Sequence, residues 1–302
     1  MRPLIVLALV LFAMAGLTSC SKPEKVQQVR IGIIRPSIDH LPLSVALEKQ
    51  YLDPAKLKVY SFTSGWEVQE AITAGKLDLA IMPFTYAWTA VSKGYKLKII
   101  SCLERETDGI VAMPEYKNLK ALDKRKIGLL RASTLEILMQ DTAKRNGITY
   151  EPVYFRTPIE MIAAFKALVV DAVVCYVPLI QKMGSPYQVL HWFSETYPGH
   201  PCCDLVASEE ILKTQPKAIE NIQDGINQAV KDINTPAESV FRLVMQEYGL
   251  DSLQAVNALK RTRFDNKLTE NDKQFELMMM QSFQEKGYLK HIPAIADVFA
   301  NK

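Results

Sequence analysis

The sequence is poor in the residues that bind metals or form disulfide frameworks. Its 302 residues include five cysteines and four histidines, and it contains no Cys-x-x-Cys motif. The histidines, His40, His191, His200 and His291, are scattered along the chain. These absences argue against a structural metal site and against a disulfide-rich scaffold. We therefore expect no metal and no cofactor.

An excess of charge of one sign is also missing. The chain has 36 basic and 33 acidic residues, so its formal net charge is +3. Nucleic-acid-binding domains usually carry a concentrated basic surface, and we expect no nucleic-acid partner. The composition, 48% hydrophobic and 23% charged, is typical of a globular protein, and the length is sufficient for two domains.

Long hydrophobic runs are absent apart from one at the N-terminus. Arg2 supplies a positive charge, residues 4–15 are almost all apolar, and small residues precede Cys20. This pattern is typical of a secretory signal peptide, which we assign to residues 1–19. No later stretch reaches about 18 apolar residues, so we expect the rest of the chain not to span a membrane.

The end of this leader, Leu17-Thr18-Ser19-Cys20, resembles the lipobox of bacterial lipoproteins, in which the cysteine becomes the first mature residue and carries the lipid. The resemblance implies lipid attachment at Cys20 and a lipidated tether over residues 20–28. It also implies a location in the cell envelope, facing the periplasm or the exterior of the cytoplasmic membrane. The alternative is an ordinary secreted protein whose leader contains Cys20 by chance.

The other cysteines, Cys102, Cys175, Cys202 and Cys203, would then lie where disulfides persist. A bridge between the neighbours Cys202 and Cys203 would be strained. A bridge from Cys175 to one of them stays open. The neighbouring pair is either reactive or a buried part of the core or of a cleft wall, and we favour burial because free cysteine is commonly buried.

Strand and helix patterns alternate through the first two thirds of the chain. They predict strands at 29–34, 58–62, 77–81, 96–102 and 110–113 and, after a charged connection at 117–126, at 126–130, 152–155 and 171–176. Helices with capping boxes are predicted to begin after Ser64, Ser133 and Thr157. This alternation favours two parallel α/β sheets in series.

From Ser208 onward strand patterns give way to amphipathic helices. We predict helices at 216–233, 238–248, 252–259 and 269–286. The run Met278-Met279-Met280 lies in the last of these, and we expect it to fill a core.

The two halves share a short motif. Residues 71–81 and residues 164–174 each combine a helix end, a turn, an aspartate and a buried strand, and each is followed by a proline. We expect the aspartates, Asp78 and Asp171, to serve the turns before the strands. The second copy lacks the glycine present at Gly75.

Together these features resemble the substrate-binding lipoproteins of bacterial ABC importers, in the branch that handles nitrate, sulfonates, taurine and pyrimidine precursors of thiamine. The resemblance lies in Arg30-Ile31-Gly32-Ile33, Pro42 with Ala46-Leu47-Glu48-Lys49, Ser64-Gly65, Ala74-Gly75-Lys76-Leu77-Asp78, and His200-Pro201-Cys202-Cys203. The chain departs from the family pattern at Gln50, where members usually carry glycine, and this puts the turn geometry in doubt.

The resemblance implies an α/β fold of the type II periplasmic-binding-protein architecture. Two Rossmann-like lobes would be joined by two crossing segments, near 111–118 and 202–208, with the C-terminal helices packed on lobe one. Lobe one would comprise 29–114 and 206–302, and lobe two 115–205.

The resemblance also implies a non-catalytic solute-binding protein. It would capture a small molecule, anionic or heteroaromatic, in the cleft between the lobes and deliver it to an ABC permease. One alternative is an enzyme of the related fold, similar to a pyrimidine synthase or to a desulfinase with a cysteine nucleophile. Another is a sensory or assembly lipoprotein that docks a different protein.

Candidate ligand-binding residues lie in the loops after the strands, because ligands of open α/β sheets bind beyond the carboxyl ends of the strands. They are Asp39, His40, Ser64, Trp66, Phe84, Thr85, Tyr86, Arg131, Ser133, Thr134, Tyr176, His200 and Cys202. The fork of donors on Arg131 suits a carboxylate, sulfonate or phosphate. Trp66 and Tyr86 are candidates for stacking on a ring.

Several of these candidates have structural alternatives. Ser64 and Ser133 are also expected as helix N-caps, Arg131 as a solvated surface residue, and the aromatic residues as part of the lobe interface. We do not interpret Asp39-His40 as an acid–base pair, because adjacent side chains generally point apart and no nucleophile stands beside them.

Overall fold

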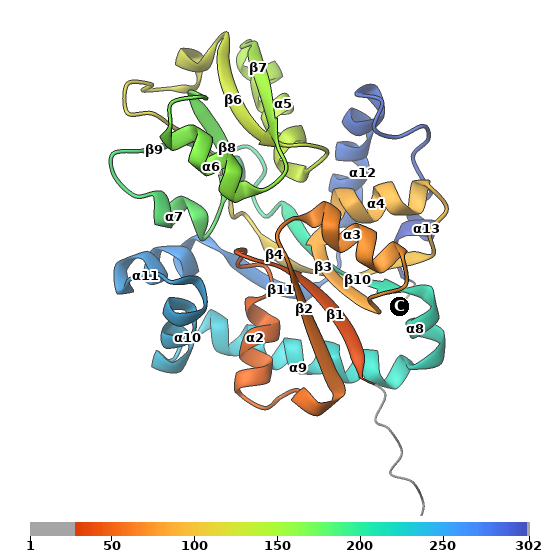
Figure 1. Ribbon diagram of the computed structural model, residues 1–302. Helices are drawn as coiled ribbons and strands as arrows, with labels where there is room; N and C mark the ends of the chain where they lie inside the picture. Colours follow the sequence, from red (N-terminus) through yellow and green to blue (C-terminus); the bar gives the residue numbers. More distant parts are fainter. Residues whose placement is uncertain (1–27, 301–302) are drawn as a thin grey trace, which may run out of the picture.

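The computed structural model describes residues 28–300, so the predicted signal peptide and lipid-attachment site lie outside the described residues. The chain forms two mixed sheets, each the centre of one lobe (Figure 1). The predicted two-lobed α/β fold is therefore confirmed. The sheets are mixed rather than parallel, because strands that follow a crossing between the lobes run antiparallel to their neighbours.

The first sheet has the strand order β11-β4-β10-β3-β1-β2. Its strands are β1 (Val29–Ile34), β2 (Leu57–Phe62), β3 (Leu79–Pro83), β4 (Leu97–Arg105), β10 (Pro201–Ser208) and β11 (Arg263–Lys267). β1 pairs in parallel with β2 and β3, whereas β10 is antiparallel to β3 and β4.

The second sheet has the order β7-β6-β8-β5-β9. Its strands are β5 (Asp108–Ala112), β6 (Arg125–Leu130), β7 (Tyr150–Phe155), β8 (Ala172–Tyr176) and β9 (Gln188–Trp192). β6 is parallel to β7 and β8, and β5 is antiparallel to β8 and β9.

The chain crosses between the sheets at places that differ from those expected. The first crossing is the short link of Glu106 and Thr107 between β4 and β5, not 111–118. The return lies between β9 and β10, at residues 193–200, ahead of the expected 202–208. Residues 108–112 therefore belong to the second sheet and residues 201–205 to the first.

The first sheet buries both of its faces, and the alternation of residues along β3 shows this directly. Leu79 and Ile81 join one core and Ala80 and Met82 the other, because successive strand residues point to opposite faces. The core of Leu79 also includes residues of α2 (Leu41–Glu48), α9 (Pro216–Asn234), α10 (Glu238–Tyr248) and α11 (Ser252–Arg261). The core of Ala80 includes residues of α3 (Gly65–Thr73), α4 (Phe84–Ser92), α12 (Glu270–Glu285) and α13 (Ile295–Val298).

The second sheet is packed against α5 (Thr134–Asn146) and α6 (Pro158–Lys166), and α7 (Leu179–Met183) follows β8. The remaining short elements are α8 (Glu209–Thr214) and the 3-10 turns Pro54–Lys56, Leu119–Leu122 and Phe193–Glu195. The C-terminal helices pack on lobe one as expected, but α12 also contacts α5 of lobe two.

Two strands, β9 and β11, were not predicted. Each lies at the edge of its sheet, and edge strands are commonly short and polar. The residues of β11, Arg-Phe-Asp-Asn-Lys, contain one apolar side chain and so carry no alternation to recognise. In α12 the expectation for the methionines holds for Met279 and Met280, which are buried, whereas Met278 is 39% exposed.

The repeated motif has the same geometry in both lobes. Asp78, just before β3, accepts a hydrogen bond from the backbone N–H of Arg30 in β1 at 2.8 Å. Asp171, just before β8, accepts one from the backbone N–H of Lys126 in β6 at 2.9 Å. Each aspartate thus ties its turn to the start of the neighbouring parallel strand. The turn at Gln50 also keeps a left-handed conformation, with φ of 58°, although the residue is not glycine.

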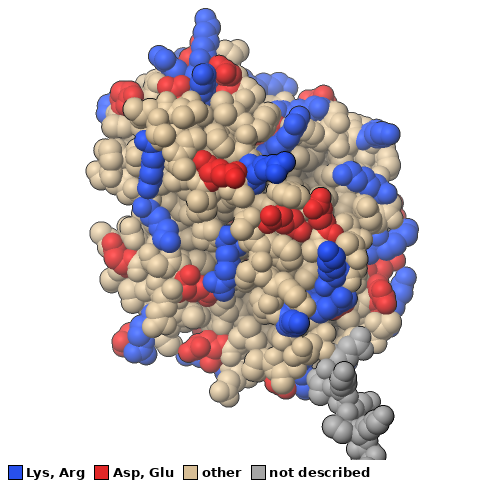
Figure 2. Space-filling model, in the orientation of Figure 1, with Lys and Arg blue, Asp and Glu red and all other residues tan. Residues whose placement is uncertain are grey.

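Charged side chains of both signs are scattered over the face seen in Figure 2. This distribution agrees with the small net charge. Within residues 28–300, no helix combines the length and the apolar character needed to cross a membrane.

Candidate ligand-binding site

A cavity lies between the lobes, where the carboxyl ends of strands from both sheets meet. It offers about 40 Å³ to water-sized molecules, which exceeds the roughly 10–15 Å³ that one water molecule needs. Its wall consists of Ile34, Ser37, Asp39, Ser64, Gly65, Pro83, Tyr86, Glu104, Thr107, Asp108, Leu130, Ser133, Thr134, Leu135, Pro158, Tyr176, Cys202 and Cys203. The position agrees with the strand-end rule used for the sequence.

Seven predicted ligand-binding residues lie in this wall: Asp39, Ser64, Tyr86, Ser133, Thr134, Tyr176 and Cys202. Ser133 is also the N-cap of α5, since its hydroxyl accepts a hydrogen bond from the Glu136 N–H at 3.3 Å. Ser64 stands at the N-cap position of α3, but its hydroxyl makes no hydrogen bond within the described chain. The capping bond expected for Ser64 is therefore absent.

Other candidates lie outside the wall. Trp66 is 36% exposed in an open groove beside Tyr60 and Phe62. Phe84 is buried in the core of lobe one. Thr85 is buried and donates a hydrogen bond to the Ala132 carbonyl at 3.3 Å.

Arg131 is exposed rather than aimed into the cavity. Its guanidinium lies over the rings of Tyr154 and Tyr288, at 5.3 and 6.0 Å from their centroids. This stacking arrangement is favourable for a planar cation. The described wall contains neither Arg131 nor any other arginine or lysine.

His40 and Asp39 do meet, although we expected adjacent side chains to point apart. His40 Nδ1 lies 3.1 Å from Asp39 Oδ1, and Nε2 lies 2.9 Å from Glu247 Oε1. Burial disfavours the charged imidazole, but the hydrogen bonds to both carboxylates outweigh this effect and raise the pKa of His40. The imidazole is itself behind the cavity wall, where it orients Asp39.

Two acidic residues of the wall, Glu104 and Asp108, were missed by the sequence analysis. They stand on either side of the first crossing, at the end of β4 and the start of β5, and both are buried. Burial and the charge of Asp108 raise the pKa of Glu104 well above its usual range. The signal available in the sequence was a group of carboxylates between two predicted apolar strands.

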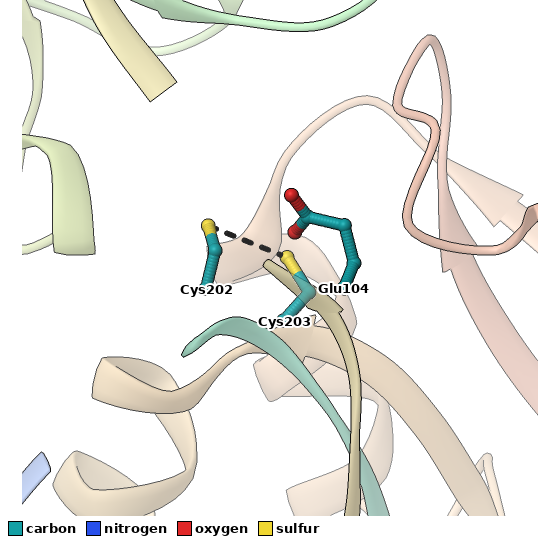
Figure 3. A group of neighbouring side chains, drawn as sticks. All are labelled: Glu104, Cys202 and Cys203. Atoms are coloured by element: carbon teal, nitrogen blue, oxygen red, sulfur yellow. Dashed lines mark hydrogen bonds between the residues drawn. The ribbon is translucent and has the colours of Figure 1, made fainter. Parts of the chain in front are cut away.

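The cysteine pair faces Glu104 (Figure 3). Pro201 pairs with Arg105 and Cys203 with Glu104, so Cys202 is the extra residue of a β-bulge, which re-aims side chains. The Cys203 thiol donates to the Cys202 sulfur, with an Sγ–Sγ distance of 3.8 Å. All four cysteines of residues 28–300 are free thiols, so the bridge left open for Cys175 is not formed.

These side chains form a possible metal-binding group that contains no histidine and was therefore not predicted from the sequence. One donor atom each from Glu104, Cys202 and Cys203 lie within 4.8 Å of one another. Thiolates and a carboxylate are ligands that Zn²⁺ accepts. Burial raises the pKa of the Cys203 thiol well above its usual range, so a metal ion would have to displace a proton to bind there.

The lobes touch each other beside the cavity. The Tyr86 hydroxyl lies 3.4 Å from the Arg131 carbonyl, across the gap between α4 and lobe two. Glu136 of α5 accepts hydrogen bonds from Lys286 and Tyr288, which follow α12, each at 2.9 Å. The described arrangement is thus a closed one.

Known structures share this architecture. The alkanesulfonate-binding protein SsuA from Xanthomonas axonopodis pv. citri, bound to MOPS, is 17% identical, with a TM-score of 0.80 over 91% of this chain and 99% of that one. A ligand-binding component of an ABC-type import system from Staphylococcus aureus, with zinc bound, is 19% identical, with a TM-score of 0.78 over 91% and 96%. The nitrate-binding protein NrtA from Synechocystis is 15% identical, with a TM-score of 0.74 over 88% and 83%.

At these identities the likeness establishes the fold, which is that of type II periplasmic binding proteins. No curated protein sequence matches the chain. The model of the NMT1-like family matches residues 22–240, which is more than half of the chain. With its two-lobed fold and its interlobe cavity, the protein belongs to the NMT1-like family.

Proposed function

We propose that the protein is an extracytoplasmic solute receptor that captures a small molecule in the interlobe cavity and delivers it to an ABC permease. The observation that carries this proposal is the cavity, whose wall is built from both lobes. A ligand held there contacts both lobes at once, and it therefore favours the closed arrangement. The proteins of similar fold named for alkanesulfonate and nitrate binding support a role in solute capture.

Attachment to the membrane through Cys20 is part of the same proposal. A tethered receptor stays close to its permease, and the polar residues after Cys20 suit a short spacer. Metabolic labelling with a fatty-acid analogue tests this point. We expect label in the unaltered protein and none in Cys20→Ala.

The cysteine pair does not favour the alternative of an enzyme with a thiolate nucleophile. Reactive thiolates have lowered pKa values and cationic neighbours. Burial raises the pKa of Cys203, and the neighbouring charges of Asp39 and Glu104 raise it further. These surroundings disfavour the nucleophilic form.

Thermal unfolding and small-angle scattering with a broad panel of solutes test the receptor function. We expect at least one solute to raise the melting temperature, because binding to the folded state alone stabilises it. The variant Thr134→Tyr, which fills the cavity, should lose this response. Trp66→Ala, outside the cavity wall, should keep it. The absence of any response over the whole panel would contradict the proposal.

A further inference from the structure

The cavity wall carries acidic groups without basic ones. Asp39, Glu104 and Asp108 line it, and all three are buried. Among the described residues, the wall includes no lysine, arginine or histidine. Buried carboxyl groups are usually paired with a cation or fully hydrogen-bonded.

Each of these carboxyl groups has an oxygen that nothing in residues 28–300 satisfies. The atoms are Asp39 Oδ2, Glu104 Oε1 and Asp108 Oδ2. The hydroxyls of Ser64 and Thr134, also in the wall, lack partners as well. A buried acceptor without a donor is costly. The wall therefore presents unpaired carboxyl oxygens, together with hydroxyls that can donate or accept, to whatever occupies the cavity.

Two histidines lie behind the wall, but they leave its carboxyl groups incompletely satisfied. His40 contacts Asp39 but also Glu247, which in turn accepts a hydrogen bond from Arg35 at 2.8 Å. His200 Nε2 lies 3.6 Å from Asp108 Oδ2, beyond hydrogen-bond range. Glu104 has neither histidine as a hydrogen-bond partner within the described residues.

Helix N-termini also reach the cavity, and they would ordinarily favour an anion. Ser64, Ser133 and Pro158 of the wall stand at the starts of α3, α5 and α6.

Each of these helices, however, carries a glutamate in its first turn that accepts a backbone N–H at the same end. Glu67 accepts from Thr63 at 2.8 Å, Glu136 from Ala132 at 2.7 Å and Glu160 from Thr157 at 3.2 Å. The charges of Glu67 and Glu160 offset the positive ends of α3 and α6, whereas the charge of Glu136 is shared with Lys286 at 2.9 Å.

We infer that the cavity selects a small cationic solute, held by Glu104 and Asp108 with Asp39, and not an anion such as nitrate or a sulfonate. This inference rests on the proposed function and names the class of its ligand. A protonated amine or amidine supplies N–H donors to the unpaired oxygens of these carboxyl groups. Because burial and the charge of Asp108 raise the pKa of Glu104, binding of a cation there releases a proton. The apolar wall, including Ile34 and Leu130, accommodates the carbon atoms of the ligand.

A divalent metal ion is the other source of positive charge. It would use the same Glu104 together with Cys202 and Cys203, whose donor atoms lie within 4.8 Å of one another. An organic cation binds through its N–H donors and does not require the thiols as ligands. The substitution Cys203→Ser therefore separates the two sources.

Calorimetry on the purified protein tests the inference with size-matched probes. Ethylammonium, acetamidinium and guanidinium are compared with acetate, nitrate and methanesulfonate in the presence of a chelator, and Zn²⁺ is titrated in its absence. We expect at least one cation to bind at least about tenfold more tightly than its matched anion, since hydrogen bonds between charged groups are the strong ones. Loss of Zn²⁺ binding in Cys203→Ser identifies the metal as the ligand, and unchanged binding of an amine in that variant identifies an organic cation.

The substitutions Glu104→Gln and Asp108→Asn should each weaken cation binding at least about tenfold. Asp204→Asn is the matched control, because Asp204 is a buried carboxyl group of β10 outside the cavity wall. Selective binding of an anion, or full affinity in both wall variants, would overturn the inference and leave the receptor function intact. Binding of no probe together with no response to the broad solute panel would overturn both. If a wall variant does not fold, the inference is tested by the unaltered protein alone: tighter binding of the cation than of its matched anion supports it, and the reverse overturns it.

Discussion

Leu168 holds the same left-handed backbone conformation in lobe two that Gly75 holds in lobe one, with φ of 61° and 70°. Both follow a helix that precedes a buried strand, and the N–H groups of Gly75 and Leu168 bond to carbonyls three residues back, at Ile72 and Phe165. The repeated motif therefore uses one turn geometry with two different residues. Glycine adopts it without strain, whereas leucine does not.

We predict that Leu168→Gly stabilises the protein by about 0.5–1 kcal/mol, because relief of strain exceeds the added entropy of the unfolded chain. Leu168 is 75% exposed, so little apolar burial is lost. Chemical denaturation measures the change. Gly75→Ala is the reciprocal variant and should destabilise the protein. A Leu168→Gly protein less stable than the original would contradict the prediction.

Removing the guanidinium of Arg105 should destabilise the fold by about 3–5 kcal/mol, because a buried carboxylate would lose its partner. Arg105, at the end of β4, donates to Asp272 of α12 at 2.6 and 2.9 Å and to the Gly199 carbonyl at 3.0 Å. Arg105 thus links the two segments that cross between the lobes to α12. We expect Arg105→Met to unfold at much lower denaturant concentration.

The variant that combines Arg105→Met with Asp272→Asn should recover part of this loss, since it removes the unpaired charge and keeps the cap of α12. Arg131→Met, which removes an exposed arginine, serves as the control and should change stability little. Equal stability of the single and combined variants would contradict the explanation.

Stability should fall as pH rises above the unfolded-state carboxyl pKa values of about 4, because two carboxyl groups, Asp204 and Glu276, are buried next to each other. Burial and the charge of Asp272 raise the pKa of Asp204, and burial and the charge of Asp204 raise the pKa of Glu276, although Trp88 donates to Glu276 at 2.7 Å. Groups with raised pKa values bind more protons in the folded state than in the unfolded state. Their contribution is therefore fully present below the unfolded pKa values and is lost as pH rises.

Asp204→Asn should flatten this dependence and raise the free energy of unfolding at pH 8 by about 1 kcal/mol. Urea denaturation of both proteins at a series of pH values measures it. Parallel curves for the two proteins would show that the pair is not the cause.

The contact of Glu136 with Lys286 and Tyr288 should favour the closed arrangement. It links α5 of lobe two to the segment after α12, which packs on lobe one. We predict that Lys286→Met combined with Tyr288→Phe increases the radius of gyration of the ligand-free protein and weakens solute binding about fivefold to tenfold, as the closed population falls. Lys290→Met, at a nearby exposed lysine, is the control. Unchanged scattering and affinity would contradict the prediction.

Local patterns in the sequence were sufficient to predict most of the elements of the fold. The β-rich run of β1, the proline at the start of α9 and the capping box of Thr157 are confirmed within a few residues. They are predictable because each depends on neighbours in the chain. The short edge strands β9 and β11 were not predicted, because pairing with a distant strand defines them.

The sequence by itself determined a two-lobed α/β fold, and it predicted an exported leader and strand-end loops as the place for a ligand. Only the tertiary structure decided which of those loop residues face the cavity, turning Arg131 outward and bringing Glu104, Asp108 and Cys203 inward. The reason is physical: the first crossing link, after Arg105, and the bulge at Cys202 set the direction of these side chains. The bulge arises from pairing between β4 and β10, which lie about 100 residues apart in the chain.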